Sequence, residues 1–131
     1  MKLTNIEAVR LINIFDGMGD KTLPRQISYA VNKNLEKLKA EINKPYEKER
    51  VNILRKYAVV DENGNQKTDN QGRLIYTDRE AYEDEMNQLL EIENDFEAHC
   101  IDESLLDQCE KENKYSVLSV KEYGALMKIL K

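Results

Sequence analysis

The feature that most constrains the fold is an apolar stripe between residues 27 and 42. Ile27, Val31, Leu35, Leu38 and Ile42 follow one another at spacings of four, four, three and four residues. This is the period of an amphipathic helix. The apolar side of such a helix must pack against another element. The chain is therefore expected to be organised around a long helix.

Two prolines bear on the limits of this helix. Pro24 suits the first helical turn, where its missing N–H is not needed. Pro45 removes one backbone hydrogen bond and crowds the preceding turn, yet Tyr46 and Tyr57 continue the apolar stripe beyond it. The sequence therefore predicts either a kink near Asn43 or two abutting helices.

Three more helices are indicated by a Ser or Thr that is followed three positions later by Glu, the spacing of a capping box. The pairs are Thr4 with Glu7, Thr77 with Glu80, and Ser119 with Glu122. We expect the first of these helices to end at Gly17 and Gly19, where glycine can adopt a left-handed conformation. The last is expected to be short, from Val120 to Leu130, with Gly124 marking a close packing contact.

Residues 59–76 differ in character from the helices on either side. β-Branched residues flank two turn sequences, and Asn63, Gly64 and Gly72 are the expected turn residues because Asn and Gly tolerate positive φ. Either the outer segments pair around a long loop, or residues 65–68 add a middle strand and form a small meander. A lone hairpin is marginal in water, so another element must pack on it. The turns explain these residues without a binding role, although the tip could also serve recognition.

The apolar period changes again after residue 91. Ile92, Asn94, Phe96, Ala98 and Cys100 alternate with acidic residues and His99. Alternation predicts a strand from about Ile92 to Ile101, in competition with a continuing helix. This strand could supply the partner that the hairpin needs. Residues 103–114 are polar and predict no more than one loose turn.

Together these patterns predict a single domain over residues 1–131, of the α+β class and mostly helical. Two long antiparallel helices are joined by a β-hairpin or small meander, with an additional strand and a short C-terminal helix. Cys100 and Cys109 are too few for a disulfide scaffold. No apolar leader and no run of 18 apolar residues is found, so we expect a reducing compartment and no contact with a membrane.

Charge is unevenly placed in this chain, whose net charge is −5. Residues 21–56 hold 10 Lys and Arg against 4 Asp and Glu, whereas residues 78–112 hold 14 Asp and Glu against 2 Lys and Arg. We favour the interpretation that two antiparallel helical regions of opposite sign attract each other. The alternative is an acidic face that meets a basic partner. Direct binding to nucleic acid is not expected, because the basic region is interleaved with Glu and the whole chain is acidic.

No cofactor or metal is expected. Counted from Asp61, the sixth and twelfth residues are Gln66 and Gly72, where a calcium loop needs Gly and Glu. His99, Cys100 and Cys109 lack the paired spacing of zinc ligands. On a strand, His99 would point to solvent and Cys100 would be half-buried on the opposite face. We find no nucleophile motif or phosphate-binding glycine loop, so we assign no catalytic residue.

Several segments, in this order, carry a resemblance that covers nearly the full length. They are KLTNIEA, LPRQISYAVNKNLEKL, the junction from PYEKERVNILRKYA to DENGN, LLEIENDFEAHCI and LSVKEYGALMKIL. In these segments the chain resembles a family of short, uncharacterised proteins encoded by phages and prophages of low-GC Gram-positive bacteria. The resemblance implies a phage origin and the cytoplasm of a bacterial host. It transfers no catalytic residue.

These observations lead to two expectations of function. The first is a non-enzymatic interaction protein that binds a host protein through an acidic surface, as an inhibitor of a nuclease or of an antiviral defence complex in the manner of an anti-CRISPR protein. The expected contact residues are Glu83, Asp84, Glu91, Glu93, Asp95 and Glu97. The alternative is a tail- or capsid-associated accessory protein or a chaperone-like protein. Such a protein would self-associate, for instance as a homodimer, and would keep an apolar stripe exposed.

Overall fold

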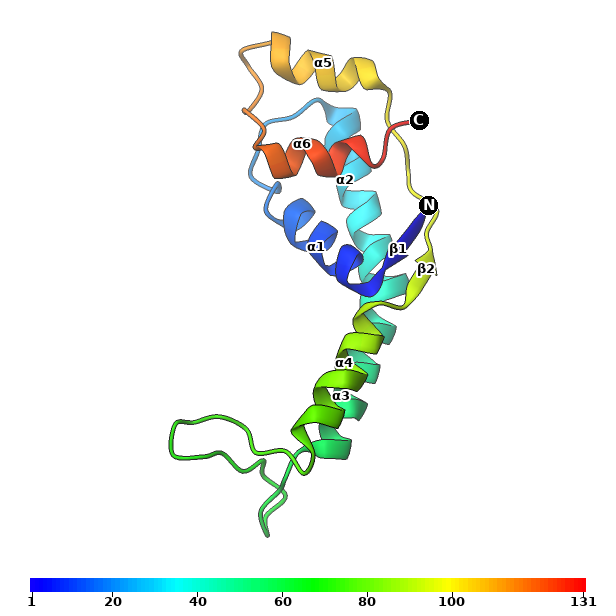
Figure 1. Ribbon diagram of the computed structural model, residues 1–131. Coiled ribbons are helices and arrows are strands. Elements are labelled where there is room, and N and C mark those ends of the chain that lie inside the picture. Colours follow the sequence, from blue (N-terminus) through cyan, green and yellow to red (C-terminus); the bar gives the residue numbers. More distant parts are fainter.

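The computed structural model describes residues 1–131 and shows a mostly helical α+β fold. Figure 1 shows a body and a narrow stalk that leads away from it to an arm. The body contains β1 (Lys2–Thr4), α1 (Asn5–Asp16), α2 (Arg25–Leu38), β2 (Glu93–Asp95), α5 (Glu103–Lys111) and α6 (Val120–Met127). The stalk consists of α3 (Lys44–Tyr57) and α4 (Arg79–Leu90), and we call residues 58–77 the arm.

The long helix predicted from the apolar stripe is present. It begins at Arg25, with Pro24 as its N-cap, and continues from α2 through a π-helical turn, η1 (Lys39–Asn43), into α3. Pro45 has no N–H to donate to a carbonyl one turn earlier. The π-helical turn before it is wider than an α-helical turn, and in it the N–H of Lys44 donates to the carbonyl of Lys39. The irregularity predicted near Asn43 is thus a π-helical turn, which lets the helix pass a proline without breaking.

The hydrophobic core lies entirely in the body. The stripe on α2 and η1 is buried at Ile27, Val31, Leu38 and Ile42. It joins a cluster of 18 buried residues to which α1, α5 and α6 also contribute. Along the long helix the cluster ends at Ile42. No residue of the stalk or of the arm belongs to it.

Two of the three predicted capping boxes are confirmed. The Thr4 hydroxyl accepts from the Glu7 N–H and the Glu7 carboxylate accepts from the Thr4 N–H, and Ser119 and Glu122 do the same. Helix α1 ends at Asp16 with Gly17 as its C-cap, in agreement with the predicted end, but φ of Gly17 is −70°, so the expected left-handed conformation is wrong.

Helix α6 is shorter than predicted and ends at Met127. A Cβ atom added at Gly124 would meet nothing within 4 Å. The close packing predicted at this glycine is therefore wrong.

The third predicted cap is wrong by one residue. Helix α4 is capped by Asp78, whose carboxylate accepts from the N–H of Ala81 at 3.1 Å. Thr77 is not available, because its N–H and its hydroxyl both donate to the Tyr57 carbonyl, at 2.7 and 3.3 Å. The threonine closes the base of the arm and does not start the helix.

The strand predicted from Ile92 to Ile101 is only three residues long. Strand β2 pairs antiparallel with β1, with Leu3 opposite Asn94, and does not reach the arm. Residues 97–100 form no bridge, and the segment ends in a single parallel bridge between Ile101 and Leu130. Instead the buried side chain of Asn34 in α2 accepts from the His99 N–H at 2.8 Å and donates to the His99 carbonyl at 2.9 Å. A side-chain amide thus substitutes for a neighbouring strand.

The loose turn predicted for residues 103–114 is also wrong, because residues 103–111 form helix α5. Leu106 and Cys109 are three positions apart and both are buried against the body. Two apolar anchors are enough to dock a nine-residue helix, but they are too short a pattern to predict one.

The arm combines the two arrangements considered for residues 59–76. Isolated bridges join Ala58 to Tyr76, Val60 to Gln66, and Thr68 to Leu74. Val59, Lys67 and Ile75 follow one another at a spacing of eight residues, and three backbone hydrogen bonds join them in a ring. The Val59 N–H donates to the Ile75 carbonyl at 3.0 Å, the Ile75 N–H to the Lys67 carbonyl at 3.0 Å, and the Lys67 N–H to the Val59 carbonyl at 2.8 Å. Each segment therefore pairs with both of the others.

The element that packs on the arm is the stalk. The Tyr76 ring stacks on the Tyr82 ring of α4, with centroids 4.2 Å apart, and Tyr57 of α3 meets Tyr82 edge-on at 6.4 Å. The predicted role of strand 92–101 as the hairpin's partner is thus wrong. Tyr57 and Tyr82 at the end of the stalk take that role.

Candidate functional site

The six acidic residues predicted to contact a partner fall within residues 83–97, and all six are exposed. Glu83 and Asp84 are on α4, Glu91 follows its last residue, and Glu93, Asp95 and Glu97 lie on β2 and just beyond it. We call these six residues the acidic ridge. The chain runs from the stalk into the body here (Figure 1), so the acidic ridge spans the junction of the two parts.

Local structure explains why these side chains point outward. In β2 successive residues alternate between the two faces, so Asn94 and Phe96 point inward while Glu93, Asp95 and Glu97 point to solvent. Asn94 then donates to the side chain of buried Asn5 at 2.9 Å. The inward residues fix the register that exposes the acidic ones.

Half of the acidic ridge has a cation beside it: Glu83 and Asp95 are in ion pairs, and the Lys37 ammonium donates to the main-chain carbonyl of Glu97. Glu83 pairs with Arg79 at 3.2 Å and Asp95 with Lys2 at 3.7 Å. Both pairs are exposed, and pairs of this kind contribute little to stability. Asp84, Glu91, Glu93 and Glu97 form no ion pair within the chain.

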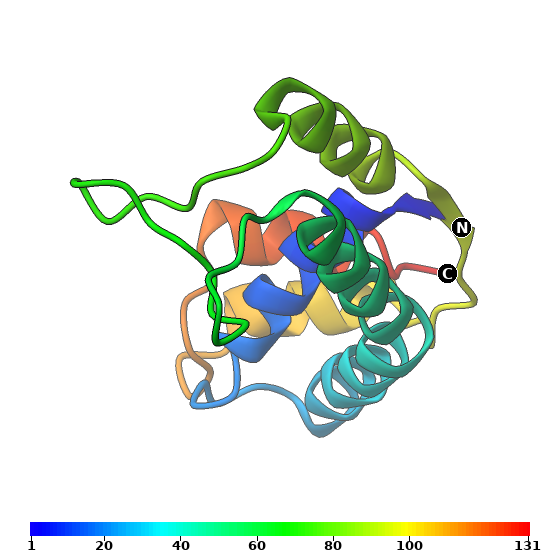
Figure 2. The same ribbon diagram turned by 90° about the horizontal axis from the view of Figure 1, so that it is seen from below.

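The basic part of the chain forms no ion pair with the acidic ridge and reaches it at Glu97, where the Lys37 ammonium donates to the main-chain carbonyl. Helices α3 and α4 lie side by side, as the favoured charge interpretation predicts (Figures 1 and 2). However, the one ion pair between them joins Lys56 to Glu85 at 3.2 Å, and Glu85 is outside the acidic ridge. Hydrogen bonds from Tyr57 and Lys56 lower the pKa of Glu85. Attraction between the helices therefore explains Glu85 but not the acidic ridge.

The predicted turn residues lie at the two tips of the arm. Gly64 and Gly72 have φ of 81° and 78°, and a Cβ atom at either position would meet nothing within 4 Å. Backbone conformation, not lack of space, therefore requires glycine. Asn63 has no positive φ, so the conformational reason given for it is wrong.

Two aspartates that the sequence interpretation missed organise these tips. The Asp61 carboxylate accepts from the N–H groups of Asn63 and Asn65, both at 2.9 Å. Asp69 does the same for Gln71 and Arg73, at 2.8 and 2.9 Å. The repeat of Asp and Gly at a spacing of eight residues is visible in the sequence; both turns were predicted from it, but the role of the aspartates was not.

His99 and the two cysteines are scattered. His99 is half-buried with its ring edge-on to Tyr29 at 5.2 Å, so the expected exposure of His99 is wrong, whereas Cys100 is half-buried as expected. Cys109 is buried, which raises the pKa of its thiol. The His, Cys, Asp and Glu side chains form no group of three or more that could hold a metal ion.

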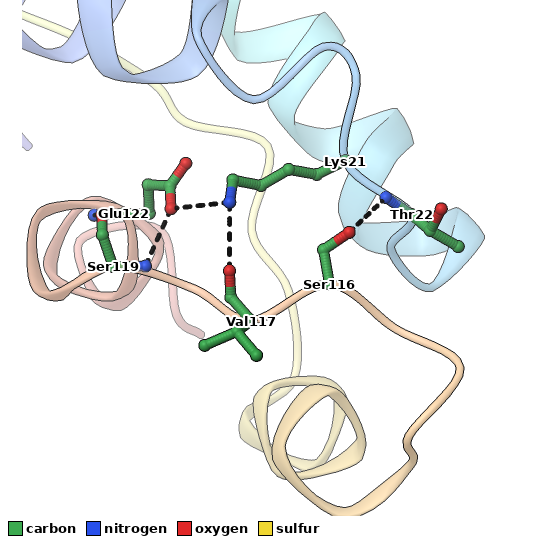
Figure 3. Close-up of polar contacts among 6 residues, drawn as sticks. All are labelled: Lys21, Thr22, Ser116, Val117, Ser119 and Glu122. Atoms are coloured by element: carbon green, nitrogen blue, oxygen red, sulfur yellow. Dashed lines mark hydrogen bonds and ion pairs between the residues drawn. The ribbon is translucent and has the colours of Figure 1, made fainter.

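The sequence interpretation also missed an apolar hollow between α5 and α6. Its volume is about 460 Å³, and its apolar lining is Cys109, Val117, Leu118, Val120 and Tyr123. Figure 3 shows the polar contacts that hold the start of α6 beside it: Lys21 reaches both the Val117 carbonyl at 3.0 Å and the Glu122 carboxylate at 3.2 Å. Because α5 was not predicted, nothing in the sequence indicated this hollow.

No helix of the chain combines the length and the apolar character needed to cross a membrane. Comparison with family models, with curated proteins and with solved structures gives no match. The resemblance to phage proteins therefore stays a prediction.

Proposed function

We propose that this chain is a non-enzymatic interaction protein that binds a basic surface of another protein through the acidic ridge. The observation that carries the proposal is the exposure of six carboxylates within residues 83–97, four of which form no ion pair within the chain. Clustered like charges repel one another, and a basic partner would relieve that repulsion. A partner that approaches such a cluster is also steered by its field.

The partner class follows from the resemblance stated above. A phage protein at work in a bacterial cytoplasm meets host nucleases and defence complexes, whose surfaces for nucleic acid are basic. The acidic ridge can occupy such a surface in place of the nucleic acid. We propose a host nuclease or an antiviral defence complex as the target.

A structural or assembly accessory of the phage particle is the second candidate. It is favoured by the arm, which extends from the body and contributes nothing to the core. An accessory protein would reach a second component of the particle with such an arm. The two candidates differ in the partner that they recover and in the part of the chain that they need.

The test is an affinity pull-down with the tagged chain from infected and uninfected host lysates, washed at low and at high salt. The ridge variant carries Glu91→Gln, Glu93→Gln and Glu97→Gln. The control carries the same chemical change at the exposed residues Glu36, Glu41 and Glu49, so the two variants have equal net charge.

A host nuclease or defence subunit that the wild type and the control retain, and that the ridge variant and high salt release, supports the proposal. Phage structural proteins recovered only from infected cells would favour the accessory role. Equal recovery by the ridge variant and the control would refute binding through the acidic ridge.

A further inference from the structure

Strand β2 has a neighbouring strand on one of its two edges only. The main chain of Phe96 exchanges two hydrogen bonds with that of Met1, at 2.7 and 2.8 Å. Main-chain groups of successive residues point to opposite edges of an antiparallel strand, so those of Glu93 and Asp95 point away from β1. Neither residue's N–H or carbonyl has a hydrogen-bond partner within the chain. We call these main-chain groups of Glu93 and Asp95 the open edge.

Helix α2 takes the place of a strand farther along the same side of the chain. The Lys37 ammonium donates to the Glu97 carbonyl, and the Asn34 amide bonds to the main chain of His99 at 2.8 and 2.9 Å. Residues 93, 95, 97 and 99 alternate with those that face β1. The side chains of α2 therefore satisfy the last two residues of this series and leave the first two without partners.

An open hollow of about 570 Å³ lies where the strand and the helix separate. It is lined by Asp95, Phe96 and Glu97 from the strand side and by Lys37, Glu41 and Ile42 from the side of α2 and η1. Neighbouring strands lie about 4.8 Å apart, so the hollow leaves room for the main chain of one more extended segment. A sheet edge with free main-chain groups and space beside it is the arrangement that binds a peptide as an added strand.

Charge indicates which segment fits. Glu93, Asp95 and Glu97 are exposed and follow one another at a spacing of two residues, so they project from one face. On the side of β1, Asp95 already has a cation as its cross-strand neighbour: Lys2 lies opposite it, and the Lys2 ammonium is 3.7 Å from the carboxylate. A segment at the open edge would place every second side chain beside these carboxylates, and opposite charges stabilise such cross-strand pairs.

We propose that β2 binds an extended basic segment of the partner protein as a third strand, with Lys or Arg at every second position. The inference rests on the proposed function, because it names the part of the partner that the acidic ridge meets. The main chain of the segment bonds to Glu93 and Asp95, while its basic side chains face Glu93, Asp95 and Glu97. The added strand ends at Glu97, where Lys37 already occupies the carbonyl.

A synthetic peptide tests the added strand directly. The probe is acetyl-Lys-Val-Lys-Val-Lys-Val-Lys-amide, titrated into the whole chain up to about 1 mM, the weak end of specific binding. Amide exchange of the chain is followed by NMR with and without the peptide. We expect slower exchange at the N–H groups of Glu93 and Asp95, by about tenfold when the free peptide is at ten times its Kd.

Two substitutions at one position separate the main chain from the charge. Asp95→Asn and Asp95→Pro both remove the carboxylate, but only proline removes the N–H at the open edge, and an edge strand tolerates proline there. Asp95→Pro should bind the peptide about threefold to tenfold more weakly than Asp95→Asn, the effect of one lost hydrogen bond. Far-UV circular dichroism confirms that both variants are folded, and the exchange measurement on the wild type does not depend on either of them.

Absence of binding at about 1 mM would overturn the proposal. So would binding that leaves exchange at Glu93 and Asp95 unchanged, or equal binding by folded Asp95→Asn and Asp95→Pro variants. The acidic ridge is scored separately by the pull-down, so a host partner that still depends on the ridge would show that the added strand alone had failed. Because Glu41 lines the hollow, the charge-matched control is repeated in this series with Glu103→Gln, at another exposed position, in place of Glu41→Gln.

Discussion

Among side chains of similar size, we expect truncation of Asn34 to destabilise the body most. Its side chain is fully buried in α2 and makes two hydrogen bonds to the main chain of His99, at 2.8 and 2.9 Å. Asn34→Ala removes both and leaves an N–H and a carbonyl without partners. Each buried group left in this way costs about 1–3 kcal/mol.

The expected net cost follows from a correction for helix propensity. Alanine is more favourable than asparagine inside a helix by about 0.6 kcal/mol, which offsets part of the loss. We expect Asn34→Ala to lower the free energy of unfolding by about 2–4 kcal/mol, a large share of the stability of a small domain. Asn32→Ala, at an exposed position of the same helix, is the control and should gain the propensity term alone.

The assay is urea denaturation followed by far-UV circular dichroism, with the slope of the transition compared between variants. If Asn34→Ala were as stable as Asn32→Ala, the Asn34 side chain would not hold residues 96–100 in place. If the slope fell together with the midpoint, partial unfolding of that segment would replace a two-state transition.

Three other outcomes are expected. Gly124→Ala should stabilise the chain by about 1 kcal/mol, because the added Cβ atom has open space; a lower melting temperature would contradict this. Gly64→Ala should loosen one tip of the arm, at a local cost of about 1 kcal/mol, because φ there is 81°; faster amide exchange confined to the arm would show it, and a matching loss of global stability would be inconsistent with the core's position in the body. For Glu122, burial alone would raise the pKa, but hydrogen bonds from Ser119 and Lys21 produce a net decrease below 4.5. The stabilisation is therefore present above about pH 4.5 and is lost as pH falls through the folded-state pKa, so Glu122→Gln should cost stability at neutral pH and progressively less in acid. An equal cost at every pH would refute a role for the charge.

The parts of the fold that could be predicted from the sequence are those with local signals. The stripe from Ile27 to Ile42 and the capping boxes at Thr4 and Ser119 depend on neighbours within one or two helical turns, and they are confirmed. Strand β1 and helix α5 depend on contacts with distant segments, and their own patterns are too short to stand out. The extent of β2 was overestimated because a side-chain amide can replace a strand.

The candidate site shows the same division. Exposure of Glu93, Asp95 and Glu97 follows from alternation alone and could be predicted. Whether α3 neutralises these residues depends on the geometry of the stalk, which brings Lys56 to Glu85 and forms no ion pair between α3 and the acidic ridge. Charge counts along the sequence cannot make that distinction, because they carry no information on which side of a helix faces which neighbour.

The pairing of β1 with β2 has a consequence for the order of folding. The partner of Leu3 is Asn94, and the carbonyl of Leu89 accepts the hydrogen bond of Asn5 at 2.7 Å. During synthesis the first helix must therefore wait for most of the chain, about 5–20 s at typical elongation rates. The stalk and the arm, whose contacts are mostly local, can form while it waits. We expect the stalk and the arm to fold first. The body should fold last, when β1 and α1 meet their partners from the second half of the chain.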